Sequence, residues 1–295
     1  MNRNRPVLYL AIIILLSTCL SFPAKSSGKT TENDTRQLGA IPDIKMSGYY
    51  YRAPETITYK SEITGTYRHA TVFLPANYSR NRKYPVLYLF HGLNGDHMSW
   101  KNKSADIILQ NLQYKGIANE MIVVCPNSAV NEKESTCGLL PHDKEKAYDL
   151  TGREVVENLM PVIESRYPVK KGRDNTAVAG NSMGGRNALY TAFTYPDLFG
   201  YVGVFSSAYV LGHKGDGGKW DPLLETLRLP EDTSDFRLLM LCVGKSDNRC
   251  GSVTYRLHDI MKSEKLNHIF HDMPGGHDNS VWKRSLYDFA AQLFK

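Results

Sequence analysis

Residues 176–194 read TAVAGNSMGGRNALYTAFT, and this stretch decides the fold class of the chain. The short apolar run 176–179 predicts a buried strand, and residues 183–194 predict a helix. Between them lies the pattern Gly180-x-Ser182-x-Gly184. Glycines on either side of the serine fit a tight turn, because a Cβ there would strike the neighbouring backbone. The stretch predicts a strained strand-to-helix turn that exposes the Ser182 hydroxyl, with an ordinary turn as the alternative.

Further apolar runs without polar alternation occur along the chain, and they are typical of strands covered on both faces. They lie at residues 86–90, 121–125, 201–205 and 238–243, and a last strand is predicted at 268–273. Helices are predicted at residues 105–114, 152–166, 253–265 and 281–294. An antiparallel pair at residues 56–62 and 66–74 precedes this series. The alternation predicts an α/β fold: a three-layer sandwich whose mostly parallel sheet of about eight strands has helices on both faces.

The composition is that of one ordinary globular domain. The chain has 295 residues, of which 42% are hydrophobic and 22% are charged. These values exclude disordered, collagen-like and coiled-coil proteins. No linker rich in Pro, Gly or Ser interrupts the sequence after about residue 49. We expect a flexible polar lead-in at residues 27–48 and one domain at residues 49–295.

The first residues have the pattern of a secretory signal peptide, placed at residues 1–26. Arg3 and Arg5 precede an apolar run at residues 7–16, and small residues follow up to Ser26. A membrane-spanning helix needs roughly 20 apolar residues, so this run is too short, and no transmembrane span is expected in the mature protein. The sequence therefore predicts export to the periplasm or the extracellular space. Lipid attachment through Cys19 is a less favoured alternative, because Thr18 is larger than the residue expected before a lipidated cysteine.

The charge and the motifs exclude several classes of partner. Removing residues 1–26 takes away three basic residues and no acidic one, and lowers the net charge from +6 to +3. A net charge this small does not indicate the basic surface that nucleic-acid binding requires. The sequence contains no C-x-x-C and no H-E-x-x-H pattern, and the glycine-rich residues 212–220 lack the phosphate-binding pattern. No metal or cofactor is expected.

An exported chain favours disulfides, and four cysteines remain after residue 26. Local pairing would join Cys125 to Cys137 and Cys242 to Cys250, since each pair brackets one loop. The second bridge would hold the loop that contains Asp247. Four separate thiols are the alternative.

A serine nucleophile needs a base, and the base needs an acid that orients it. Asp247 follows the strand predicted at 238–243, and His277 follows the last predicted strand in a loop with two glycines. Both are expected at the sheet edge where Ser182 lies, because carboxyl ends of parallel strands meet at one edge. Asp235 and Asp272 are the alternative acids.

The negative oxygen of a tetrahedral intermediate needs hydrogen-bond donors. One is expected from the backbone N–H of Met183, directly after the serine. The other is expected from the loop after the strand at 86–90, and the amide of Leu93 is the candidate. His91, at the start of that loop, is then expected to hold the loop rather than to react.

Four stretches occur here in the same order as in one known family: YLFHGL at 88–93, GNSMGG at 180–185, GKSD at 244–247, and GGH at 275–277 with Trp282. The chain resembles the feruloyl and acetyl xylan esterases of carbohydrate esterase family 1, which are esterase D-like α/β-hydrolases. The resemblance covers residues 56–295. It implies Ser182, Asp247 and His277 as nucleophile, acid and base, and Leu93 and Met183 as oxyanion amides.

The resemblance implies a secreted serine esterase that cleaves feruloyl or acetyl esters on plant cell-wall polysaccharide such as xylan, or on its oligosaccharides. Residues 126–148 and 212–220 depart from the family pattern, so the acyl group and the natural polysaccharide stay open. A thioester hydrolase or an acyltransferase of the same superfamily is one alternative. A carbohydrate-binding protein without turnover is another.

Overall fold

The computed structural model describes residues 40–208 and 236–295. The predicted signal peptide, most of the lead-in, Cys19 and residues 212–220 lie outside these ranges. Within them, no helix has the length and hydrophobicity to cross a membrane.

One eight-stranded sheet forms the centre of the domain, in the order β1-β2-β4-β3-β5-β6-β7-β8. Strand β1 pairs antiparallel with β2, and β2 with β4, while every other pair is parallel. The predicted fold class is confirmed. The strands are β1 Glu55–Lys60, β2 Tyr67–Phe73, β3 Val86–Phe90, β4 Ile122–Pro126, β5 Thr176–Asn181, β6 Tyr201–Phe205, β7 Leu238–Gly244 and β8 Ile269–Met273.

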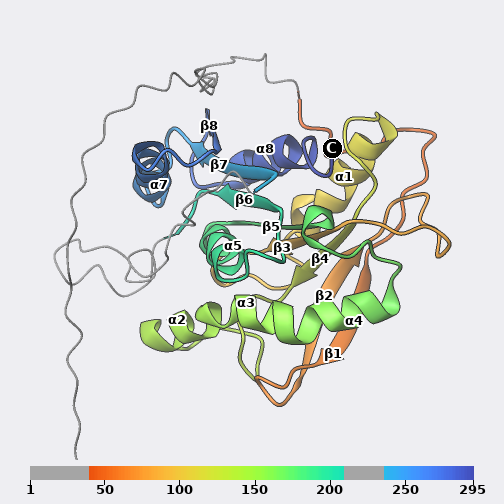
Figure 1. Cartoon of the computed structure of the whole chain (residues 1–295), viewed down its shortest axis with the longest axis horizontal. Coiled ribbons are helices and arrows are strands. Elements are labelled where there is room, and N and C mark those ends of the chain that lie inside the picture. The colour runs from red at the N-terminus through yellow and green to blue at the C-terminus, as the bar shows by residue number, and fades with distance from the viewer. Residues whose placement is uncertain (1–39, 209–235) are drawn as a thin grey trace, which may run out of the picture. The chain divides into compact units, whose positions relative to one another are not determined.

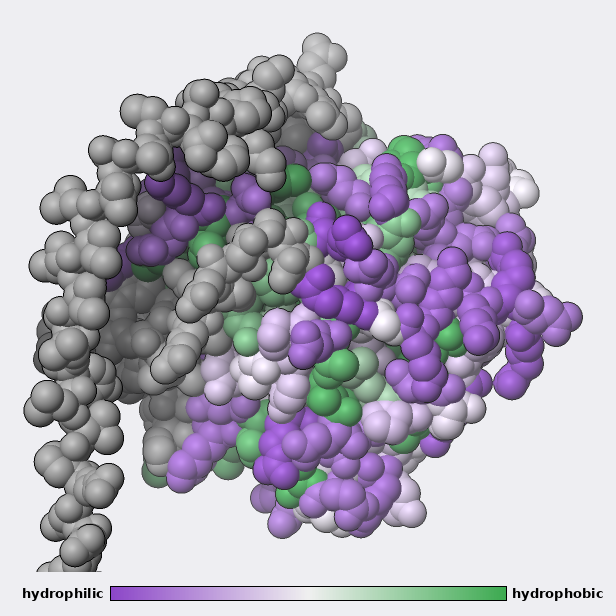
Figure 2. All heavy atoms as spheres, in the orientation of Figure 1, coloured by the Kyte–Doolittle hydropathy of each residue, from purple (hydrophilic) through white to green (hydrophobic). Residues whose placement is uncertain are grey.

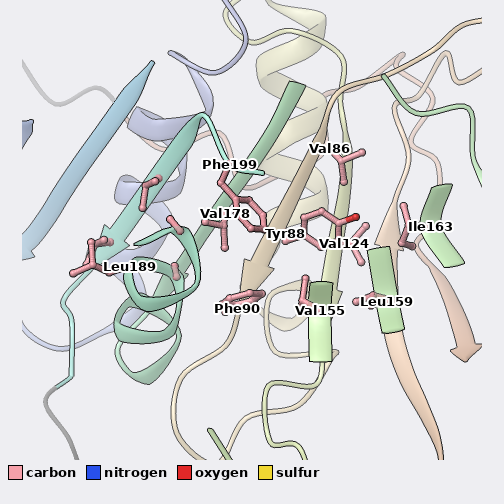
Figure 3. Close-up of a cluster of buried hydrophobic side chains, with 14 of the residues drawn as sticks. Val86, Tyr88, Phe90, Val124, Val155, Leu159, Ile163, Val178, Leu189 and Phe199 are labelled. Atoms are coloured by element: carbon pink, nitrogen blue, oxygen red, sulfur yellow. The ribbon is translucent and has the colours of Figure 1, made fainter. Parts of the chain in front are cut away.

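Helices cover both faces of this sheet (Figure 1). On one face lie α1 (Ala105–Tyr114) and α8 (Asn279–Ala290). The other face is covered by α4 (Met160–Arg166), α5 (Met183–Thr194) and α7 (Gly251–Ser263). Figure 3 shows how Val155, Leu159 and Ile163 face the strand residues Val86, Tyr88 and Val124 across the second of these layers.

The side chains of β3 point alternately to the two faces of the sheet, and both faces are buried, so its sequence is apolar throughout. Tyr88 and Phe90 belong to the buried cluster on one face, whereas Leu87 and Leu89 belong to the cluster on the other. Because both faces are covered, successive side chains are buried in turn. Outside the core, the face shown in Figure 2 is mainly hydrophilic, with hydrophobic residues in small separate spots.

The helices depart from the prediction in two places. Helix α2 (Pro141–Asp149) lies mostly within the stretch 126–148, where no helix was predicted, and proline stands in its first turn. The predicted helix 152–166 is divided into α3 (Thr151–Glu154), a π-helical stretch Val155–Leu159, and α4. Pro161 follows the π stretch and has no N–H to donate, so an ordinary α-helical hydrogen bond is missing at this point.

Both predicted disulfides are absent from the structure. Cys125 and Cys242 are buried in the cluster beneath α1 and α8, whereas Cys137 is exposed in the loop after β4. Cys250 precedes α7, which packs on the opposite face of the sheet from Cys242. The pairing was wrong because closeness in sequence does not decide which face of the sheet a side chain occupies.

Candidate active site

Ser182 stands at the turn between β5 and α5, with φ 55° and ψ −120°. Its N–H donates to the carbonyl oxygen of Phe205 at 2.8 Å, which ties the turn to the neighbouring strand β6. Gly180 and Gly184 allow the turn, because a Cβ on Gly184 would lie 2.4 Å from the Phe90 carbonyl oxygen. A Cβ on Gly180 would lie 2.5 Å from the backbone of Gly184. The strained turn predicted from the glycine spacing is therefore present.

The structure brings the three predicted side chains into one hydrogen-bonded chain. Ser182 Oγ lies 2.9 Å from His277 Nε2, and His277 Nδ1 lies 2.8 Å from Asp247 Oδ2. The Asp247 side chain is fully buried and that of His277 is 10% exposed. With Asp247 ionised, Nδ1 donates to the carboxylate and Nε2 is left to accept the serine proton. The arrangement can remove a proton from the Ser182 hydroxyl.

Asp247 is held as an anion by its own loop. Its Oδ1 accepts the N–H groups of Arg249 at 3.0 Å and Cys250 at 2.8 Å. Burial acts to raise the pKa of Asp247, but the Cys250 N–H and His277 outweigh burial and hold that pKa below its usual value. Asp247 therefore stays charged near neutral pH.

The loops that hold Asp247 and His277 pack against each other through glycines. A Cβ on Gly244 would lie 2.5 Å from the carbonyl oxygen of Gly275. The N–H of Ser246 donates to that same oxygen at 2.9 Å. This close backbone contact fixes the separation of the acid and the base. Gly275, two residues before His277, has φ 126°, a backbone conformation that favours glycine.

Of the two alternative acids, Asp272 lies in the described part of the chain, away from the site. Asp272 lies 3.6 Å from Lys245 Nζ and 3.3 Å from the Tyr255 hydroxyl, and its polar partners in the structure do not include His277. Asp235 lies outside the described residues.

The two predicted amides flank Ser182. A Cβ on Gly92 would lie 3.2 Å from Ser182 Cβ, so the Gly92–Leu93 backbone is directly beside the serine. Within residues 40–208 and 236–295, neither the Leu93 nor the Met183 N–H has a hydrogen-bond partner. Two unpaired N–H groups beside a serine hydroxyl can bind a negative oxygen.

Several contacts around the site were not predicted from the sequence. The Tyr148 hydroxyl, from α2, accepts the Asn94 N–H at 3.0 Å. Asp278 caps α8 and accepts the Gly276 N–H at 2.8 Å, directly beside His277. The rings of His277 and Trp282 meet edge to face at 5.2 Å. An aspartate before an apolar helical run is a sequence signal for a cap, whereas nothing local marks Tyr148.

Apolar side chains lie next to the nucleophile. Ala129, Tyr148 and Met183 form a small buried cluster, and the partly exposed Leu93 and Ala208 pack against it. The Ala208 N–H donates to the Ser182 carbonyl oxygen at 3.1 Å. Among the described residues, no group of three or more His, Cys, Asp or Glu side chains is arranged to hold a metal ion.

A family model described as "Putative esterase" matches residues 61–293. Among curated proteins, the chain is 27% identical over 270 residues to an "Endo-1,4-beta-xylanase/feruloyl esterase" of Xylanibacter ruminicola, covering 86% of this chain and 34% of the relative. It is 30% identical over 141 residues to the "Iron(III) enterobactin esterase" of Escherichia coli K12, and the match covers 48% of this chain and 35% of that relative. The chain thus spans about a third of the length of these curated relatives.

Among solved structures, the chain is similar to a ferulic acid esterase of carbohydrate esterase family 1 from Anaeromyces mucronatus. The identity is 32% and the TM-score 0.74, covering 86% of this chain and 95% of that one. The complex of that esterase with ferulic acid gives 30% identity and a TM-score of 0.71, and the match covers 86% of this chain and 94% of that one.

Proposed function

We propose that this chain, which belongs to the esterase family and within it to carbohydrate esterase family 1, is a carboxylic ester hydrolase that cleaves feruloyl esters on plant cell-wall polysaccharide such as xylan. The observation that carries the proposal is the chain Ser182–His277–Asp247, with contacts of 2.9 Å and 2.8 Å. It supports a catalytic triad in which Ser182 is the nucleophile.

In the first step, Ser182 Oγ attacks the ester carbonyl carbon and its proton moves to His277 Nε2. Asp247 keeps the imidazole in the tautomer with hydrogen on Nδ1 and stabilises the positive charge that forms on the ring. The carbonyl oxygen becomes negative in the tetrahedral intermediate. The unpaired N–H groups of Leu93 and Met183 would stabilise this oxygen.

In the second step, the intermediate collapses and the bond to the sugar oxygen breaks. His277 Nε2 returns the proton to the departing sugar hydroxyl, leaving the acyl group on Ser182. Water then takes the place of the sugar and attacks the acyl carbon while His277 Nε2 takes its proton. The second tetrahedral intermediate collapses, the bond to Ser182 Oγ breaks, and His277 returns the proton to Ser182 Oγ as the free acid leaves. The residues named supply every proton transfer that this cycle needs.

The apolar side chains beside Ser182 favour an aromatic acyl group over acetate. Leu93 and Ala208 are partly exposed next to the nucleophile, with Met183 and Tyr148 buried behind them. A phenylpropenoyl group gains more than acetate from contact with such a surface, because the gain grows with the apolar area removed from water. The similarity to ferulic acid esterases adds support.

We also propose that the protein is exported. The support is the sequence of residues 1–26, with basic residues, a short apolar run and small residues in order. An ester on cell-wall polysaccharide is met outside the cell, which fits this pattern.

The experiment that tests the function compares wild type and Ser182→Ala with methyl ferulate and p-nitrophenyl acetate. We expect ferulate release by the wild type and loss of nearly all activity in the variant. Acetate release without ferulate release would contradict the feruloyl assignment. Hydrolysis of methyl ferulate at the wild-type rate by Ser182→Ala would contradict the triad.

A further inference from the structure

His91 is a buried histidine that the proposed mechanism does not use. It follows β3 directly and is 1% exposed. Its Nε2 lies 2.8 Å from the Ser128 nitrogen, and its Nδ1 lies 2.7 Å from the Gly92 carbonyl oxygen. A backbone N–H can only donate, so Nε2 is the acceptor. The hydrogen of the neutral ring is then on Nδ1 and is donated to Gly92.

This contact controls the orientation of one peptide group. The Gly92 carbonyl oxygen accepts from His91 Nδ1 and also from the Gly95 N–H at 3.1 Å. In a planar trans peptide the C=O and the following N–H point in opposite directions. Holding the Gly92 oxygen on the His91 side therefore turns the Leu93 N–H away from the ring. That N–H has no hydrogen-bond partner in the described chain, and Gly92 adjoins Ser182.

We propose that His91 is a positioning residue, which locks the Gly92–Leu93 peptide in the orientation that presents the Leu93 N–H to the substrate oxygen at Ser182. The inference rests on the proposed esterase function. With the imidazole hydrogen bond lost, rotation of this peptide would remove the donor and turn a carbonyl oxygen toward the site. The transition state would then lose an amide, while binding of the uncharged ester would change little.

A second buried group keeps Ser128 in place. Arg68 on β2 is fully buried and donates to the carbonyl oxygens of Asn127, Ala129 and Asn131, at 2.7, 3.0 and 3.0 Å. Its Nε lies 3.3 Å from Glu154 Oε1, also buried. The guanidinium thus fixes the backbone on both sides of Ser128. It thereby also holds in place the Ser128 N–H, which selects the tautomer of His91.

The ring also stays neutral in the working range of an esterase. Burial lowers the pKa of His91 to about 4, and the hydrogen bonds that a charged ring would make with Gly92 and Asn127 only partly offset it. The charged groups that act on the ring are Asp96 and Lys103, with opposite effects. Above that pH, Nε2 is free of a proton and can accept from Ser128.

Two substitutions of His91 separate this role from simple packing. The side-chain nitrogen of Asn reaches the place of Nδ1 and can donate to the Gly92 oxygen. The side-chain oxygen of Gln reaches the place of Nε2 and can accept from Ser128, but it leaves Gly92 without the imidazole. We expect His91→Gln to lower kcat for methyl ferulate roughly 10- to 100-fold with KM nearly unchanged. His91→Asn should recover most of that loss.

If His91 only filled space, the larger Gln side chain would replace it at least as well as Asn. Equal kcat values for the two variants, or a higher kcat for His91→Gln, would therefore overturn the proposal. Gly95→Ala is an independent test that keeps the histidine. Its Cβ would lie 2.7 Å from His91 Nδ1 and push the ring from Gly92. A folded Gly95→Ala protein with a lowered kcat and unchanged KM supports the proposal, and one with wild-type kcat overturns it. Ser182→Ala, assayed alongside, reports on the esterase function by itself.

Discussion

Replacing Gly184 by alanine tests the packing that forms the turn at Ser182. The added Cβ would lie 2.4 Å from the Phe90 carbonyl oxygen and 2.6 Å from that of His91, whereas ordinary contact begins at 3.4 Å. The neighbours must therefore move by about 1 Å, and they are backbone atoms of or next to a central strand, which cannot rotate away. Overpacking of this kind costs about 1–3 kcal/mol, and we expect the upper end, about 3 kcal/mol.

The assay is thermal unfolding together with kcat for methyl ferulate. A loss of about 3 kcal/mol lowers the Tm of a domain of this size by roughly 6–12 °C. The same shift moves Ser182, so kcat should also fall. The matched control is Gly116→Ala, where φ is +66° but nothing lies within 4 Å of the new Cβ. It should cost about 1 kcal/mol of backbone strain and leave kcat unchanged. A Gly184→Ala protein with wild-type kcat and a Tm no lower than that of Gly116→Ala would show that the turn at Ser182 does not depend on the missing Cβ.

Three further predictions follow from other parts of the structure. Asp247→Asn should lower kcat by roughly 10³–10⁴-fold with little change in Tm, because the amide favours the wrong tautomer of His277; a loss below tenfold would count against Asp247 as the acid. The pKa of His91 is about 4 in the folded protein and about 6.5 in the unfolded chain. The unfolded chain therefore binds the proton more tightly, and the protein loses stability as the pH falls from about 6.5 to about 4. Urea unfolding should show that the free energy of unfolding of the wild type falls by about 3 kcal/mol more than that of His91→Asn between pH 7 and pH 4. An equal dependence of the unfolding free energy on pH in both proteins would contradict this prediction. Iodoacetamide should label the exposed Cys137 in the native, unreduced protein, and Cys125 and Cys242 only after denaturation, because both are buried; a Cys125–Cys137 bridge in the peptide map would disprove the thiol assignment.

The parts of the fold that the sequence predicts are those in which local residues and tertiary structure make the same demand. Strand β3 is covered on both faces, so its residues must all be apolar, and the run at 86–90 marks it. The backbone around Gly180 and Gly184 leaves no room for a Cβ, so the glycines mark the turn. Asp247 and His277 follow parallel strands, whose carboxyl ends lie along one edge.

What the sequence did not predict depends on contacts between distant segments. Helix α2 is mostly polar, and its contacts are with distant segments: the buried Tyr148 reaches Asn94, and Asp149 pairs with Arg186. The contacts of Arg68 with the loop after β4 join residues about 60 positions apart, and a basic residue in a strand gives no hint of them. The cysteine pairing failed because Cys242 is buried beneath α1 and α8, whereas the Cys250 sulfur lies 3.9 Å from His277 Nε2.

In the proposed mechanism, Ser182 carries the acyl group between the two halves of the reaction. The most direct test is to quench the reaction with a feruloyl ester within the first turnover and to map the acylated peptide by mass spectrometry. We expect a feruloyl group on Ser182 that builds up before steady state and is missing from Ser182→Ala. A feruloyl group on another residue, or ferulate release by Ser182→Ala at the wild-type rate, would contradict it.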